Sequence, residues 1–132
     1  TPTLQISDRI MVSKLNYMFQ EPARFEAVVF AYPRDPSRDF IKRIVGLPGE
    51  HLEVRDGYLY INNNKLVESF EIFRDKDNFG PVDIPGGCYF VMGDNRSNSS
   101  DSRAFGFLPR DYIIGKAMVR IWPLERVGFL PQ

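Results

Sequence analysis

One short run of the sequence gathers most of the groups that could do chemistry. Gly93–Arg103 contains two carboxylates, two guanidiniums and four serine hydroxyls, and it directly follows the apolar stretch Cys88–Met92. Asp94 and Arg96 lie two residues apart, as do Asp101 and Arg103, and an extended chain would place each such pair on one face. The run is open to two interpretations. It is either a catalytic loop carried by the end of a strand or a long turn built from the usual turn-forming residues.

A lysine with an unusual setting lies in a second run, Asp39–Glu50. Read as a strand, this run puts Phe40, Lys42 and Ile44 on one face, so the ammonium group would stand among bulky apolar side chains. Desolvation favours the neutral amine and lowers its pKa, and a neutral lysine near pH 7 can act as a general base. The alternative is a lysine that protects a strand edge from aggregation while its charged end reaches water.

A lysine base needs a nucleophile, usually a hydroxyl, and groups that hold the amine in place. Five serines are the candidates within reach of this argument: Ser7, Ser13, Ser99, Ser100 and Ser102. Taken singly, each is more typical of a structural residue than of a nucleophile.

The elements that must position these groups are mostly strands. Short runs rich in β-branched and aromatic residues predict strands at Arg9–Leu15, Ala27–Tyr32, Phe40–Val45, His51–Arg55, Tyr58–Ile61, Cys88–Met92 and Gly115–Trp122. Asp56-Gly57 between two alternating runs indicates a hairpin. Glu68–Phe79 is polar and predicts a loop or flap, and Pro109–Ile113 predicts one helical turn. We therefore expect a mainly β protein with few or no helices. Its core would be a coiled antiparallel sheet, within a single domain over 1–132 that carries a small β insertion at about 50–87.

Length and composition limit the function classes. The chain has 132 residues, 43% of them hydrophobic and 26% charged, which are values typical of a globular protein. Its formal net charge is zero and no block of like charge occurs in the sequence, so nothing in the sequence indicates nucleic-acid binding. One histidine and one cysteine argue against a conventional zinc site. No apolar run is long enough to span a membrane. The sequence begins at Thr1 rather than Met, so it is interpreted as a possible fragment.

Three blocks, in this order, resemble the type I signal peptidases, the Ser/Lys leader peptidases. Pro2–Val12 is similar to the segment that follows the catalytic serine in the family pattern Ser-Met-x-Pro-Thr-Leu. Phe40–Glu50 resembles the block that carries the general base. Gly93–Arg103, followed by Gly106-Phe107-Leu108-Pro109, resembles the third block, and the second and third together are specific to the family.

The resemblance implies a role for each matching residue. Lys42 would be the general base, and Ser99 would orient its amine. Asp101 and Arg103 would form an ion pair that stiffens the loop, and Asp94 would pair with Arg43. The residues similar to those that line or border the substrate pockets are Leu4, Ile10, Val29, Asp39, Ile41 and Ser100.

The resemblance also implies substrates and location. The family removes signal peptides from exported preproteins after an Ala-x-Ala site, with shallow apolar pockets that exclude larger side chains. It uses no cofactor or metal, and it works at the plasma membrane, with the catalytic domain on the extracytoplasmic side. Tyr17, Met18 and Phe19 are suited to a membrane interface. Phe105 and Phe107 are open to the same interpretation, but core packing is favoured for these two.

One family residue has no counterpart in this sequence. The family's nucleophilic serine lies two residues before the position of Thr1, so we expect the chain as given to be inactive and a chain that includes the upstream serine to be active. Two alternatives remain. One is a non-catalytic relative that serves as a binding or assembly factor, and the other is a self-cleaving repressor with the same Ser/Lys chemistry.

Overall fold

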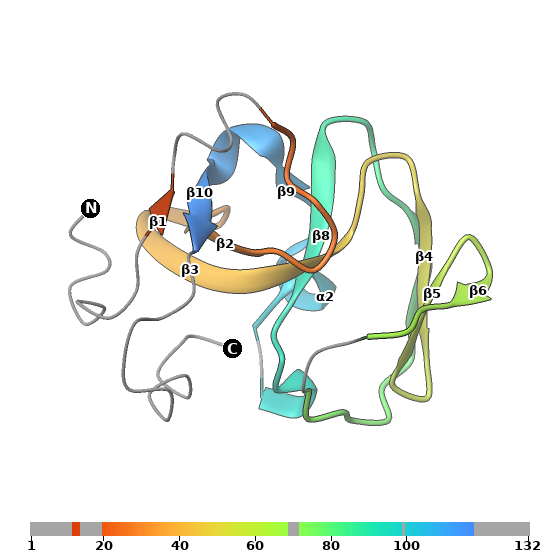
Figure 1. The fold of residues 1–132 in the computed structure, drawn as a ribbon. Coiled ribbons are helices and arrows are strands. Elements are labelled where there is room, and N and C mark those ends of the chain that lie inside the picture. Colours follow the sequence, from red (N-terminus) through yellow and green to blue (C-terminus); the bar gives the residue numbers. More distant parts are fainter. Residues whose placement is uncertain (1–11, 14–19, 69–71, 99, 118–132) are drawn as a thin grey trace.

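The computed structural model describes residues 12–13, 20–68, 72–98 and 100–117. Its strands are β1 (Val12–Ser13), β2 (Ala27–Tyr32), β3 (Asp35–Gly46), β4 (His51–Arg55), β5 (Tyr58–Ile61), β6 (Asn64–Lys65), β7 (Phe79–Asp83), β8 (Cys88–Met92), β9 (Leu108–Pro109) and β10 (Ile113–Ala117). Its helical segments are the 3-10 turns η2 (Arg96–Asn98) and η3 (Arg110–Tyr112) and the single-turn helix α2 (Ser102–Phe105). The expected mainly β fold is confirmed, as two antiparallel sheets with one short helix (Figure 1).

The larger sheet carries the lysine. Its strands are hydrogen-bonded in the order β1-β10-β2-β3-β8-β9, and β3 is its longest strand. Alternation along β2 and β3 turns Val28, Phe30 and Ile44 toward one core, which Val91 of β8 and Phe105 of α2 complete. Because this core contains the face of β3 on which Lys42 lies, the sheet fixes the surroundings of the lysine.

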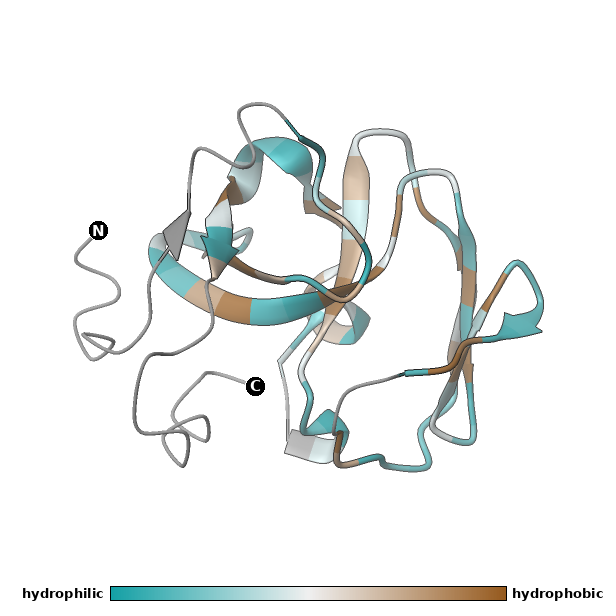
Figure 2. Cartoon of the chain, viewed as in Figure 1, coloured by the Kyte–Doolittle hydropathy of each residue, from teal (hydrophilic) through white to brown (hydrophobic). Residues whose placement is uncertain are grey.

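The smaller sheet, in the order β6-β5-β4-β7, comes entirely from the chain between His51 and Asp83. Alternate residues of β4 and β5, such as Leu52 and Leu59, are fully buried against Phe90 and Met92 of β8. Figure 2 shows the resulting alternation of hydrophobic and hydrophilic residues along β4, and Figure 1 shows β8 between the two sheets. Strand β8 therefore contributes side chains to both cores, and the two sheets pack together through it.

Several sequence predictions need correction. The described residues of the polar run Glu68–Phe79, predicted as a loop or flap, lie outside the strands up to residue 78, but Phe79 begins strand β7 (Phe79–Asp83), which the sequence did not predict. A proline is tolerated there because β7 is the edge strand of its sheet and need not donate on its open side. The run Gly93–Arg103 is not extended, since η2 and α2 fold its two halves into helical turns.

Most predicted strands are found. Those predicted at Ala27–Tyr32, His51–Arg55, Tyr58–Ile61 and Cys88–Met92 match β2, β4, β5 and β8. The strand expected at Phe40–Val45 is longer, beginning at Asp35. The helical turn near Pro109–Ile113 is confirmed as η3. Only parts of the strands predicted at Arg9–Leu15 and Gly115–Trp122 fall within the described residues, as β1 and β10.

Candidate functional site

Lys42 is a buried lysine in the middle of β3. It is 4% exposed and lies opposite Val28 in the β2–β3 register, with its Nζ 5.7 Å from the centroid of the Phe40 ring. Burial lowers the pKa of Lys42 to about 8, although the nearby carboxylates of Asp101 and Asp94 raise it in part. The amine is therefore deprotonated in a substantial fraction of molecules slightly above neutral pH, as a general base requires.

The side chain of Arg43, the next residue, lies on the other face of the strand, and its guanidinium forms a bidentate ion pair with Asp94. Its Nε donates to Asp94 Oδ1 at 3.0 Å and its Nη2 donates to Asp94 Oδ2 at 2.8 Å. Its Nη1 also donates to the carbonyl of Phe25 at 2.9 Å. This bidentate geometry links β3 to the residue that follows Gly93, so the start of the loop has a fixed position relative to Lys42.

The second half of the loop is organised by Asp101. Its carboxylate caps α2 by accepting from the backbone N–H of Arg103 at 3.0 Å, and it accepts from the backbone N–H of Gly93 at 3.3 Å. The guanidinium of Arg103 donates to the same carboxylate at 3.0 and 2.9 Å. The hydroxyl of Ser102 accepts from the backbone N–H of Val91 at 2.9 Å. Asp101 is 1% exposed, so one buried carboxylate joins the two ends of the loop to α2.

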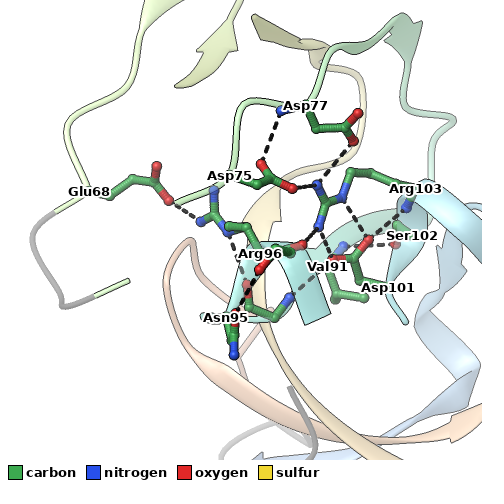
Figure 3. Close-up of polar contacts among 11 residues, drawn as sticks. Glu68, Asp75, Asp77, Val91, Asn95, Arg96, Asp101, Ser102 and Arg103 are labelled. Atoms are coloured by element: carbon green, nitrogen blue, oxygen red, sulfur yellow. Dashed lines mark hydrogen bonds and ion pairs between the residues drawn. The ribbon is translucent and has the colours of Figure 1, made fainter. Parts of the chain in front are cut away.

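Sequence reasoning missed a group of charged residues that contacts the loop from the connection between β6 and β7. Arg96 is 2% exposed and forms an ion pair with Glu68 (Figure 3). The Nη1 of Arg103 donates to Asp75 and to Asp77, each at 3.2 Å. The available signal was the density of charge in Glu68–Phe79, which was interpreted as a solvent-exposed flap.

The expected pocket residues fall into three groups. Val29 and Ile41 are buried in a small apolar cluster with Ala27, Ile114 and Ala117, on the face of the sheet opposite Lys42. Asp39 is half-buried on β3 and Ser100 is exposed. Leu4 and Ile10 lie outside the described residues, as does Ser99, the residue expected to orient Lys42.

The aromatic residues proposed for a membrane interface have other surroundings where they are described. Phe105 is 8% exposed in the core beside Phe30, and Phe107 packs against the core under the smaller sheet. Tyr17 and Phe19 lie outside the described residues. Across the described residues, no helix is both long and apolar enough to span a bilayer.

A solved structure of the same class shares this architecture. The crystal structure of a signal peptidase I from Enterococcus faecalis aligns with a TM-score of 0.61 and 35% identity, over 74% of this chain and 97% of that one. The fold with its buried strand lysine is thus that of a signal peptidase.

Sequence comparisons define the family. Residues 1–122 match the family described as signal peptidase, peptidase S26. A probable signal peptidase I-2 from Synechocystis sp. is 44% identical over 98% of this chain, and a signal peptidase I from Leptolyngbya laminosa is 42% identical over 98%. The chain belongs to the signal peptidase family, peptidase S26. It spans 62% of the length of the first relative and 67% of that of the second.

Proposed function

We propose that this chain forms most of the catalytic domain of a serine endopeptidase that removes signal peptides from exported preproteins, with Lys42 as its general base. The observation that carries the proposal is the burial of Lys42 on an apolar sheet face, which lowers its pKa to about 8, next to a rigid loop with the family's residues. The nucleophile would be the serine that the family pattern places two residues before Thr1.

The proposed reaction uses Lys42 twice. The neutral amine accepts the serine hydroxyl proton while the serine oxygen attacks the carbonyl carbon of the scissile peptide bond. The resulting ammonium group donates that proton to the departing amine of the mature protein, leaving the signal peptide as an ester on the serine. Water then attacks this ester, with Lys42 accepting its proton, and the regenerated serine hydroxyl takes the proton back.

The substrate strand would add to the open edge of β3 ahead of Lys42. In the described part of the chain, β8 pairs only with Arg43–Gly46, so Asp35–Lys42 has β2 on one side alone. Ile44 exchanges its backbone hydrogen bonds with the β2 side. By antiparallel alternation, the backbone groups of Ile41 and Asp39 face the open edge. Two residues are therefore available to bind an extended signal-peptide end through the main chain.

The proposed function also includes a cellular location and a class of partner. The parent protein would act at the plasma membrane, with this domain on the extracytoplasmic side, and the partners would be the C-terminal ends of signal peptides. Ser99 would orient the Lys42 amine, while the Arg43–Asp94 and Asp101–Arg103 pairs support the loop.

The test compares variants of the full-length protein on a preprotein with an Ala-x-Ala cleavage site. We expect Lys42→Ala to reduce kcat at least about 1,000-fold, since both proton transfers lose their base. Lys65→Ala is the matched control, because Lys65 is an exposed lysine on β6. Full cleavage by Lys42→Ala would refute the assignment of the base. A wild-type protein that binds signal peptides without cleaving them would indicate the non-catalytic binding factor instead.

A further inference from the structure

Charged residues in the connection between β6 and β7 contact the Gly93–Arg103 loop. We call Glu68 together with residues 72–77 the strap. The side chains of Glu68 and Arg96 are each 1% exposed and form an ion pair, and Arg74 donates to Glu68 at 3.2 Å. Two more strap carboxylates, Asp75 and Asp77, bind Arg103. Figure 3 shows the strap carboxylates approaching the two guanidiniums of the loop from one side.

The strap is also fixed at its other face, to the hairpin turn between β4 and β5. The backbone N–H of Gly57 donates to the carbonyl of Asp77 at 2.9 Å, and Arg74 donates to the carbonyl of Gly57 at 3.0 Å. A Cβ on Gly57 would lie 1.9 Å from the carbonyl oxygen of Asp75, so the strap backbone touches the turn directly. The strap is therefore held between the small sheet and the loop.

Arg96 connects the strap to the loop backbone through hydrogen bonds to both. Its Nε donates to the carbonyl of Gly93 at 3.0 Å, and its own backbone N–H donates to the carbonyl of Phe73 in the strap at 2.9 Å. The backbone N–H of Phe73 in turn donates to the carbonyl of Asp94 at 2.8 Å. Gly93 and Asp94 are thus held from the strap side by Arg96 and from the β3 side by Arg43.

We propose that the buried Glu68–Arg96 pair is a positioning element, through which the small sheet holds the Gly93–Arg103 loop in place over Lys42. The inference rests on the proposed function, since it assigns these residues to the site of Lys42. Neither residue touches the reacting atoms. Burying the two charges costs desolvation free energy, which can exceed the attraction between them. A contribution to stability alone therefore does not account for this buried pair. In the described structure Arg96 Nη1 is buried without a hydrogen-bond partner, an additional cost that a purely stabilising contact does not explain.

A double replacement separates positioning from stability. Glu68→Gln alone leaves the Arg96 charge buried and unpaired and is expected to unfold part of the protein. Glu68→Leu with Arg96→Met fills the space with apolar side chains and is expected to retain the wild-type Tm or exceed it. It nevertheless loses the hydrogen bond to the carbonyl of Gly93. Glu53→Leu with Arg55→Met is the matched control, because that ion pair lies on β4 of the smaller sheet and is partly exposed.

The first readout is independent of cleavage. The ionisation of Lys42 is followed by NMR of the full-length protein labelled with ¹³C at lysine Cε. Burial is the largest influence on the Lys42 pKa and lowers it, while the carboxylates of Asp101 and Asp94, both in the loop, raise it. A loosened loop admits water, so we expect the Lys42 pKa to rise by about half a unit or more in the Glu68/Arg96 double variant. The control should leave it unchanged.

The second readout is cleavage of the Ala-x-Ala preprotein. We expect kcat to fall about 10-fold or more in the double variant, with KM within about twofold, because misplacing the base affects the chemical step. A folded double variant with wild-type Lys42 ionisation and wild-type kcat overturns the positioning role. A wild-type protein without any cleavage activity overturns the proposed function, while the NMR comparison still tests the positioning of the loop.

Discussion

Replacement of Lys42 by Met should stabilise the protein near neutral pH. Met has a similar length and keeps the apolar contacts of the side chain, but it has no charge to desolvate. The pKa of Lys42 is lowered by burial from 10.5 to about 8, so the folded state binds its proton less tightly than the unfolded state. Between these values the unfolded state binds more protons, and wild-type stability must rise with pH.

The magnitude follows from the same two values. The gap between 10.5 and about 8, at about 1.4 kcal/mol per pH unit, corresponds to about 3 kcal/mol. This stability is present above pH 10.5 and lost as the pH falls through about 8. Between pH 10 and pH 7 the free energy of unfolding of the wild type should therefore fall, relative to Lys42→Met, by about 2–3 kcal/mol.

The assay is urea unfolding followed by circular dichroism, on the wild type and the variant, at pH 7, 8, 9 and 10. Only the difference between the two proteins is used, so pH effects that are common to both cancel. Lys65→Met, which makes the same replacement at an exposed lysine on β6, is the control. A flat Lys42→Met difference across this range would show that burial does not lower the Lys42 pKa, and the general-base argument would lose its physical foundation.

Three further predictions concern residues that stabilise the strands and loops around Lys42. Gly46→Ala should lower the free energy of unfolding by about 1–3 kcal/mol, measured by urea unfolding, because its Cβ would meet core side chains at 2.5 and 2.8 Å; an unchanged midpoint would contradict the packing at this bend. Ser102→Ala should cost about 1–3 kcal/mol in the same measurement, since it leaves the buried N–H of Val91 without its acceptor; Ser102→Thr is the comparison that retains the hydroxyl. Burial raises the pKa of Glu50, but the hydrogen bonds from Arg24 and the backbone outweigh it and leave that pKa below its ordinary value. Glu50→Gln should therefore lower Tm at pH 7, and this loss should disappear as the pH falls below the ordinary carboxyl range; a Tm difference independent of pH would refute it.

The local sequence pattern was sufficient to predict those elements whose structure depends on neighbouring residues in the chain. The hairpin at Asp56-Gly57 follows from a backbone with positive φ at both residues, which Asp and Gly tolerate. The face on which Lys42 lies follows from strand alternation alone. Strand β7 and the helical turns of the loop were not predicted. Pro81 is compatible with a strand only because β7 lies at the edge of its sheet, and α2 begins where the side chain of the buried Asp101 caps it. The edge position depends on pairing with β4, about thirty residues earlier in the sequence, whereas the cap is a local contact between Asp101 and the backbone N–H of Arg103.

The sequence by itself determined the family, the mainly β fold and the identity of the lysine, because these depend on residue types and on their spacing along strands. Only the tertiary structure decided which charges meet. The spacing of Asp94 and Arg96 indicated a shared face, yet Asp94 binds Arg43 and Arg96 binds Glu68. Ion pairs form between groups that the folded backbone brings within a few ångströms, and the packing of the smaller sheet against β8 places the strap there. Spacing along the chain does not contain that information.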